Sequence, residues 1–237
     1  MKLVLMAGGR GVRLKPLTDN MPKPMIPLNG KPMLQYNIEW ARENGIKEII
    51  ICCGYLSEKI KDYFGDGSSF GVDIKYAVED KPLGTAGALR NAKQFLDSED
   101  FILLYADVLC KVNFKKIMQL HKDFNAVCTL AVQHSSHPYE SDLIELQGKK
   151  VLKFLRRPHM DLLKTDLGNA GLHVVNPKIF EMIPEGKCSL ENEILPALVT
   201  DSKVAGYFTT EFLEDMGKLE RLKKFEQKIK SKGWNFL

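Results

Sequence analysis

The chain has 237 residues, of which 44% are hydrophobic and 27% are charged, the composition of an ordinary soluble globular protein. Its 34 basic and 30 acidic residues leave a formal net charge of +4, and the basic residues are dispersed except in segment 218–232. A nucleic-acid-binding protein is expected to concentrate them on one face, so the sequence predicts no nucleic-acid partner and weakly favours small anionic ligands. The apolar stretch Leu3–Ala7 is too short for a signal peptide or a membrane span, so no membrane partner is expected.

The five cysteines, at positions 52, 53, 110, 128 and 188, lie in apolar surroundings and lack the spacing of metal ligands. Such cysteines are typical of reduced core thiols in a cytosolic protein. We therefore expect a cytoplasmic location.

The first half of the chain alternates short apolar runs with helical segments. Continuous apolar runs predict strands that are buried on both faces of a parallel sheet, and a helix between two of them predicts a crossover connection. The predicted strands are residues 3–6, 48–53, 73–78 and 101–105, and the predicted helices are residues 35–44, 57–64 and 86–96. This alternation predicts a doubly wound sheet.

From residue 128 onward, turns rather than helices separate the apolar runs, so this half is expected to be mixed or antiparallel. Its predicted strands are residues 128–133, 142–147, 151–155 and 172–175. A helix interrupted near Pro196 is predicted over 191–199, and an amphipathic helix over 218–232, with Leu219, Leu222, Phe225 and Ile229 at helical spacing. The sequence thus predicts a single α/β domain over 1–237 with a doubly wound, mostly parallel mixed sheet, and it contains no hexapeptide repeats of the kind that build a β-helix extension.

A glycine-rich loop follows the first predicted strand. Gly8, Gly9 and Gly11 allow the backbone to approach a phosphate closely and to turn its N–H groups inward, while Arg13 and Lys23 supply positive charge. Ligands of an open parallel sheet bind beyond the carboxyl ends of its strands, which is where this loop lies. The loop lacks the Lys-Ser or Lys-Thr of a P-loop and the three spaced glycines of a dinucleotide-binding turn. Its glycines alone would also fit a tight turn with solvated basic residues.

The complete run from Gly8 to Met25 resembles the signature of the sugar-phosphate nucleotidyltransferase family: Gly-Gly-x-Gly-x-Arg-Leu, then Pro-Leu-Thr, then Pro-Lys-Pro-Met. The resemblance continues in order through Pro82–Ala88, 106–107, 169–171 and 215–217, and it covers roughly residues 1–220. It implies a Rossmann-like, glycosyltransferase-A-like nucleotidyltransferase fold and an enzyme that joins a nucleoside triphosphate to a sugar 1-phosphate with release of pyrophosphate. Residues 1–127 would then bind the nucleotide and residues 128–217 the sugar phosphate, followed by a C-terminal helix over 218–237.

The resemblance also implies individual roles. The family residue matching Arg13 binds the departing pyrophosphate, the one matching Lys23 binds the α-phosphate, and the aspartates matching Asp107 and Asp215 jointly hold Mg²⁺. Fixed cations suit this chemistry, because negative charge builds up on the phosphate oxygens in the transition state. The implied catalytic residues are Arg13, Lys23 and Asp107, and the implied nucleotide-binding residues are Ala7, Gly8, Gly9, Gly11, Arg13, Lys23, Glu79, Pro82, Gly84, Thr85 and Asp107. Ala106 stands where the family usually has glycine, and its methyl group could crowd the nucleotide.

The acceptor side departs from the family pattern. Arg156-Arg157-Pro158 occupies the position of a Glu-Lys-Pro whose glutamate contacts sugar hydroxyls and whose lysine binds the sugar phosphate. Arg157 can replace the lysine, but Arg156 cannot replace the glutamate, because a guanidinium group only donates hydrogen bonds. We hypothesise that Arg156 clamps the sugar phosphate together with Arg157 or reads an additional acidic group. The alternative is a solvated arginine that points away, since neighbours on a strand face opposite sides. Asn169 and Gly171 complete the expected sugar-phosphate site.

The segment Pro82–Gly87 resembles that of the mannose and manno-heptose guanylyltransferases more than that of the thymidylyl enzymes. GTP is therefore the favoured nucleotide, with Glu79 or Asp80 as an acceptor for guanine N–H groups, and a mannose-type or manno-heptose-type 1-phosphate is the favoured acceptor. Two alternatives stay open: a thymidylyl-, uridylyl- or cytidylyltransferase for another sugar 1-phosphate, and a catalytically inactive homologue that binds a nucleotide sugar. The presence of every implied catalytic residue favours catalysis. A homo-oligomer is left open.

Overall fold

The computed structural model describes residues 1–160, 163–232 and 234. Its strands are β1 (Lys2–Met6), β2 (Pro27–Leu28), β3 (Lys31–Pro32), β4 (Glu48–Cys53), β5 (Asp73–Val78), β6 (Phe101–Tyr105), β7 (Val108–Lys111), β8 (Cys128–His134), β9 (Leu143–Gln147), β10 (Lys150–Leu155), β11 (Leu167–Val175), β12 (Val204–Phe208) and β13 (Phe212–Asp215). Its helices are α1 (Met33–Glu43), α2 (Ser57–Phe64), α3 (Gly84–Asn91), α4 (Phe114–Phe124), α5 (Leu195–Thr200) and α6 (Leu219–Lys232). A π-helical turn over Leu190–Ile194 leads directly into α5.

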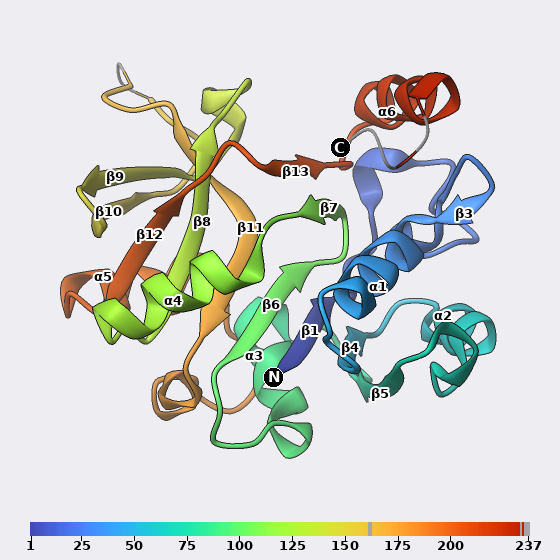
Figure 1. The fold of residues 1–237 in the computed structure, drawn as a ribbon, viewed down its shortest axis with the longest axis horizontal. Helices are drawn as coiled ribbons and strands as arrows, with labels where there is room; N and C mark the ends of the chain where they lie inside the picture. Colours follow the sequence, from blue (N-terminus) through green and yellow to red (C-terminus); the bar gives the residue numbers. More distant parts are fainter. Residues whose placement is uncertain (161–162, 233, 235–237) are drawn as a thin grey trace.

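Within the described residues, nine strands form one sheet in the order β5-β4-β1-β6-β11-β8-β12-β10-β9 (Figure 1). The first four strands in this order run parallel to one another. β11 then runs antiparallel to both β6 and β8, whereas β12 is parallel to β8 and β10 is antiparallel to β12 and β9. The α/β class and the mixed sheet are confirmed, but the prediction that the sheet is mostly parallel is wrong.

A short connection sets the antiparallel pairing of β9 with β10. Residues 148–149 alone join β9 to β10. A turn of two residues can join only antiparallel neighbours, because a parallel pair requires a crossover of a dozen or more residues. The second half of the sheet therefore has the mixed character that its turn-linked strands predict.

Helices cover both faces of the sheet. Leu3 and Leu5 of β1 belong to a core cluster with residues of α1, α2 and α4, whereas Val4 belongs to a second cluster with residues of α3 and α5. These alternate residues point to opposite faces, and all three are fully buried. Burial on both faces explains why the strand is a continuous apolar run in the sequence.

Several elements depart from their predicted form. β4, β5, β6 and α2 have the predicted bounds, but the sequence patterns do not predict α4, β7, β12 or β13. The predicted helix 191–199 is present as the π-helical turn 190–194 followed by α5, and the change from π to α helix lies next to Pro196, in the first turn of α5.

The strands β7 and β13 pair antiparallel outside the main sheet, with Asp215 opposite Val108. Just beyond this pair, the Met216 N–H group donates to the Asp107 carbonyl at 2.8 Å. The pairing brings together two segments that are far apart in the sequence.

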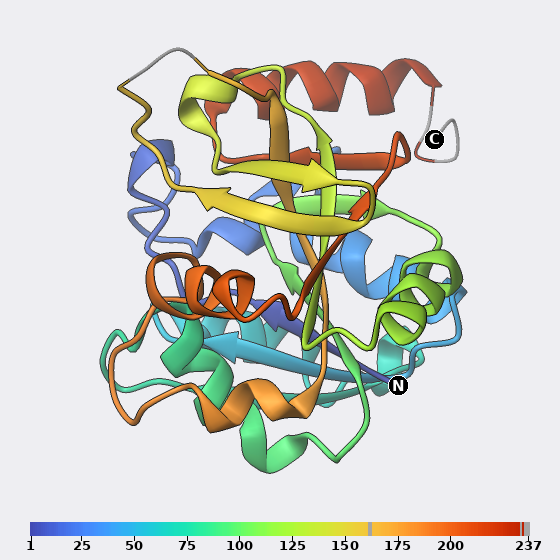
Figure 2. The same ribbon diagram turned by 90° about the vertical axis from the view of Figure 1, so that its left-hand side faces the viewer.

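Helix α6 lies at the same end of the molecule as β13 and the β2–β3 hairpin (Figures 1 and 2). Leu222, Phe225 and Ile229 are buried against a cluster that includes Leu14 and Ile26 of the first loop. Leu219 is 46% exposed, so it does not join the predicted apolar face. Residues 233 and 235–237 of the predicted C-terminal segment lie outside the described residues. Among the described helices, none combines the length and apolar character needed to cross a membrane.

The first turn of α3 rests on the backbone of Cys188. The N–H groups of Ala86 and Gly87 donate to the Cys188 carbonyl oxygen at 3.0 and 3.2 Å. Gly84 has a φ of +73°, and a Cβ atom at this position would lie 2.5 Å from the same oxygen. The start of α3 therefore requires glycine for both its backbone conformation and its close approach.

We expect Gly84→Ala to destabilise the protein clearly more than Gly148→Ala. Both substitutions place a side chain in the left-handed region, at about 1–2 kcal/mol, but Gly148 has a φ of +59° with no described heavy atom within 4 Å of an added Cβ. Urea unfolding would measure the difference, and hydrogen exchange should show the Ala86 and Gly87 amides losing protection only in Gly84→Ala. Equal effects of the two substitutions would show that the contact with Cys188 does not constrain α3.

Candidate active site

The glycine-rich loop leaves the sheet at the carboxyl end of β1. The Ala7 N–H group still donates to the Cys52 carbonyl at 2.8 Å, after which the chain turns at Gly11, whose φ is +62°. The Thr18 hydroxyl donates to the Gly11 carbonyl at 3.0 Å and closes the loop onto itself. The backbone between Ala7 and Gly11 therefore borders an open space rather than the core.

A cavity of about 590 Å³ lies beside this loop. The residues that the sequence assigns to nucleotide binding all line it, namely Ala7, Gly8, Gly9, Gly11, Arg13, Lys23, Glu79, Pro82, Gly84, Thr85 and Asp107. Of the two acidic candidates for contacting a base, Glu79 lines the cavity and Asp80 is not among its described lining residues. We call this space the nucleotide cavity.

The Glu79 carboxylate is anchored at the edge of the nucleotide cavity. Its Oε2 atom accepts a hydrogen bond from the Leu83 N–H group at 3.0 Å. Burial raises the pKa of Glu79, and the hydrogen bond from Leu83 opposes this rise. One of the two carboxylate oxygens of Glu79 is therefore hydrogen-bonded to the loop that precedes α3.

Lys23 and Asp107 line this cavity, and Asp215 lies close to Lys23 without being among the described lining residues. Lys23 is 8% exposed and its Nζ atom forms an ion pair with Asp107 Oδ2. A Cβ atom on Gly217 would lie 2.8 Å from Asp215 Oδ1 and 3.2 Å from Lys23 Nζ, which places Asp215 beside the same lysine. Arg221 of α6 donates to Asp215 Oδ2 at 2.7 Å.

The two aspartates suit a magnesium ion that is shared with a phosphate. Their side chains are 29% and 39% exposed for Asp107 and Asp215, so both remain accessible to a ligand. The described residues contain no cluster of three or more His, Cys, Asp or Glu side chains that could hold a metal ion without other ligands. Magnesium often takes one or two carboxylates and completes its shell with phosphate oxygens and water, which this pair allows.

A second cavity, of about 650 Å³, contains the predicted sugar-phosphate residues Arg156, Arg157, Asn169 and Gly171 in its lining. We call it the acceptor cavity. Arg156 lines this cavity together with Arg157 and does not point away from it. Both arginines follow β10, which ends at Leu155, so the alternation of side chains along a strand does not apply to them. Its guanidinium group is nevertheless engaged: Nη1 pairs with Asp142 Oδ2, and Nε donates to Asn192 Oδ1 at 2.8 Å.

The two cavities share part of their lining. Arg13, Thr85, Tyr105 and Asp107 border both of them. Ala106 lies between two of these residues but is fully buried in the core and is not among the described lining residues of the nucleotide cavity. Its methyl group therefore does not crowd that cavity.

Two residues of this region were not singled out by the sequence patterns. Tyr105 ends β6, and Glu191 lies on the π-helical turn, where its carboxylate accepts hydrogen bonds from Tyr105, Thr85 and Ser189. Burial alone would raise the pKa of Glu191, but these hydrogen bonds outweigh it and lower the pKa. An acidic residue in an otherwise ordinary helical pattern gives no signal in the sequence, because its partners are distant along the chain.

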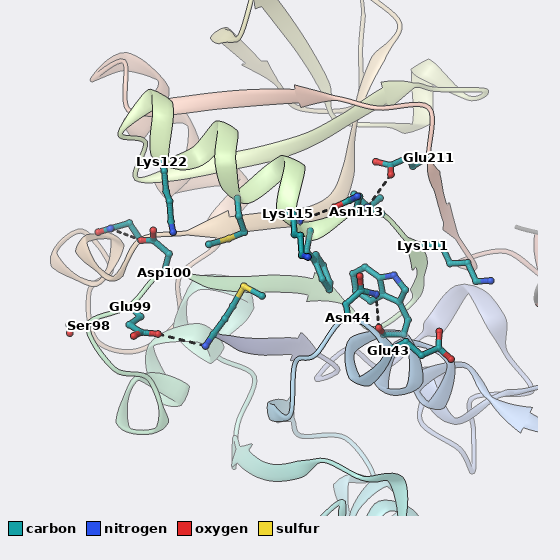
Figure 3. Close-up of a pocket in the computed structure, with 16 residues that line it drawn as sticks. Glu43, Asn44, Ser98, Glu99, Asp100, Lys111, Asn113, Lys115, Lys122 and Glu211 are labelled. Atoms are coloured by element: carbon teal, nitrogen blue, oxygen red, sulfur yellow. Dashed lines mark hydrogen bonds and ion pairs between the residues drawn. The ribbon is translucent and has the colours of Figure 1, made fainter.

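A further hollow, of about 1150 Å³, lies away from these residues (Figure 3). Trp40, Asp100, Phe114 and Lys115 are among the residues that line it. Asp100 precedes β6, so the hollow lies toward the amino end of this strand, whereas ligands of open α/β sheets bind beyond the carboxyl ends. Its volume alone does not make it the functional site.

Comparisons with known proteins agree with the family resemblance of the first loop. A model of the nucleotidyl transferase family matches residues 2–232. The mannose-1-phosphate guanylyltransferase of Mycobacterium tuberculosis is 32% identical over 218 residues, covering 90% of this chain and 60% of that protein. The UTP–glucose-1-phosphate uridylyltransferase of Synechocystis is 30% identical, covering 92% of this chain and 61% of that protein. The chain thus spans about three fifths of the length of these curated relatives.

Among solved structures, HddC from Yersinia pseudotuberculosis in complex with GMP-PN has a TM-score of 0.81 and 25% sequence identity, and the match covers 96% of this chain and 99% of that one. The fold and the order of the motifs therefore agree with the match to the family model over residues 2–232, and the chain belongs to the nucleotidyl transferase family.

Proposed function

We propose that the protein transfers a nucleoside monophosphate from a nucleoside triphosphate to a sugar 1-phosphate and releases pyrophosphate. The observation that carries this proposal is the meeting of the nucleotide and acceptor cavities at Arg13 and Asp107, beside Lys23. Two substrates bound on either side of this junction would bring a phosphate oxygen of one close to the α-phosphorus of the other.

The reaction requires the residues to position substrates and neutralise charge. An oxygen of the sugar phosphate forms a bond to the α-phosphorus, while the bond from that phosphorus to the bridging oxygen breaks and pyrophosphate leaves. Lys23 would face the α-phosphate and Arg13 the departing pyrophosphate, where negative charge accumulates. Bound Mg²⁺, held by Asp107 and Asp215, would supply further positive charge to the phosphate oxygens.

We favour GTP as the nucleotide and a mannose-type or manno-heptose-type 1-phosphate as the acceptor. The Mycobacterium relative is named a mannose-1-phosphate guanylyltransferase, and the HddC structure contains GMP-PN. Among the described residues, no hydrogen-bond donor contacts Glu79 Oε1, and at the cavity edge this oxygen suits the N–H groups of guanine. Because one relative is named a uridylyltransferase, a nucleotide with another base is the second candidate.

The five buried, unbridged cysteines favour a reducing, cytoplasmic compartment.

Pyrophosphate release, measured over a panel of nucleoside triphosphates and sugar 1-phosphates with Mg²⁺, tests the proposal directly. We expect the highest kcat/KM with GTP and a mannose-type or manno-heptose-type acceptor. A higher value with UTP, dTTP or CTP would correct the base. Binding of a nucleotide sugar without turnover of any pair would instead identify an inactive homologue.

We expect Asp107→Asn and Asp215→Asn each to lower kcat/KM on the order of a hundredfold or more, because each removes a charged ligand for the metal at the transferred phosphate. The Asp123→Asn variant is a matched control, because this exposed carboxylate at the end of α4 lies outside both cavities. Circular dichroism would establish that the three variants fold alike. Full activity of either site variant at saturating Mg²⁺ would remove that aspartate from the mechanism.

Arg156→Glu should raise the KM of the acceptor about tenfold and change the order of preferred sugars. The new carboxylate would face Asp142, the present partner of Arg156, and like charges would repel in the acceptor cavity. Arg156→Gln separates the loss of the guanidinium group from the added charge. If both variants keep the acceptor KM and the sugar preference of the wild type, Arg156 lies outside the site and the double clamp with Arg157 is wrong.

A further inference from the structure

Glu191 occupies the wall between the nucleotide and acceptor cavities. It lines the acceptor cavity, and two of its hydrogen-bond partners, Thr85 and Tyr105, line both cavities. Its Oε2 atom accepts from the Thr85 hydroxyl at 2.7 Å, and its Oε1 atom accepts from the Tyr105 hydroxyl. The carboxylate therefore bridges two side chains that line the shared space.

These two partners belong to the segments that form the site. Thr85 is the second residue of α3, directly after Gly84 at the start of the helix. Tyr105 is the last residue of β6, and Asp107 follows it after one residue. A single side chain thus connects the loop on the nucleotide side with the strand end that presents the aspartate.

The hydrogen bonds fix the direction of each hydroxyl group. The Thr85 hydroxyl accepts from the Leu190 N–H group at 2.8 Å while it donates to Glu191, so it has no freedom to rotate without losing a bond. The Tyr105 hydroxyl donates to Glu191 Oε1, so its direction is fixed as well. A mostly buried carboxylate is stable only when such donors compensate for its lost hydration.

The backbone that carries Glu191 is itself unusual and well anchored. Residues 190–194 form a π-helical turn, a rare conformation that occurs frequently at functional sites. The Ser189 hydroxyl donates to Glu191 Oε2 at 3.0 Å and accepts from the Asn192 N–H group at 3.1 Å. The turn therefore presents the carboxylate in one orientation.

We propose that Glu191 is a positioning residue that holds Thr85 and Tyr105 as the common wall of the two cavities, so that it sets the affinity for the nucleoside triphosphate and for the sugar 1-phosphate together. This inference rests on the proposed function. Glu191 acts through its two partners, and the loss of its carboxylate would release both sides of the wall at once.

The test compares Glu191→Ala and Glu191→Gln with Glu193→Ala. Glu193 lies on the same π-helical turn and accepts from the Ser189 N–H group at 2.8 Å, but it is not among the described residues that line the two cavities. Its removal disturbs the turn without removing the bridge. Calorimetry would give the Kd of GTP without an acceptor, steady-state assays the acceptor KM, and thermal unfolding the midpoint of each variant.

We expect Glu191→Ala to weaken GTP binding and to raise the acceptor KM, each about tenfold, and Glu191→Gln to recover part of both losses. Glu193→Ala should stay within about twofold of the wild type in both constants, even with a comparable fall in the unfolding midpoint. Tyr105→Phe should weaken binding in the wild type but add less than twofold to Glu191→Ala, because the bond it removes is already absent. If Glu191→Ala does not fold, the Kd and KM of Tyr105→Phe and Glu191→Gln still decide the role of Glu191.

The outcomes separate this inference from the proposed function. If the wild type binds GTP but releases no pyrophosphate with any acceptor, the proposed function fails, and the Kd series still decides the role of Glu191 in the wall. If turnover occurs but the Glu191 variants match Glu193→Ala in Kd and KM, only the positioning role is overturned. If the wild type binds no nucleoside triphosphate, both are overturned.

Discussion

The parallel pairing of β1 with β6 is the constraint on which the site depends. Its register places Met6 beside Tyr105, so the two strands end at the same level. The glycine-rich loop and the turn that carries Asp107 therefore leave the sheet side by side, and the ion pair between Lys23 and Asp107 connects them. A shift of this register by one residue would turn one strand over relative to the other and move the loop away from the aspartate.

Three aspartates that line the two cavities each face a cation of the protein itself. Lys23 pairs with Asp107, Arg221 with Asp215, and Arg156 with Asp142. A charge in a partly buried site is costly unless it is paired, and these pairs keep the cavities lined with charged groups in the absence of substrate. Substrate phosphates would compete with the carboxylates for the same cations. Under the proposed function, substrate binding would exchange one ionic partner for another, which would limit the charge that is left uncompensated at any stage.

The features that the sequence predicts correctly are local ones. A continuous apolar run such as β4 indicates by itself that the strand is buried. The motif from Gly8 to Met25 likewise lies within one loop and can be recognised from that loop alone. β7 and β13 are too short to show a period, and their pairing joins distant segments, so no local pattern reveals this contact. Only the resemblance to the family implies that Asp215 and Asp107 act together. The sequence also leaves the orientation of Arg156 open, because this orientation depends on where β10 ends. Long-range contacts of this kind decide how a site is arranged after local patterns have located it.

Helix α6 shows how the stability of the fold and the shape of the site are linked. Its buried residues share one apolar cluster with Leu14 and Ile26 of the first loop and with Met216, the residue after Asp215. The flank of the same helix supplies Arg221, one turn before Phe225, and Arg221 holds the Asp215 carboxylate. Burial of the apolar stripe therefore fixes the position of the loop, of the aspartate and of its cationic partner in a single packing event. Because this helix follows Asp215 directly in the chain, the segment that completes the acidic pair also brings the hydrophobic face that anchors it.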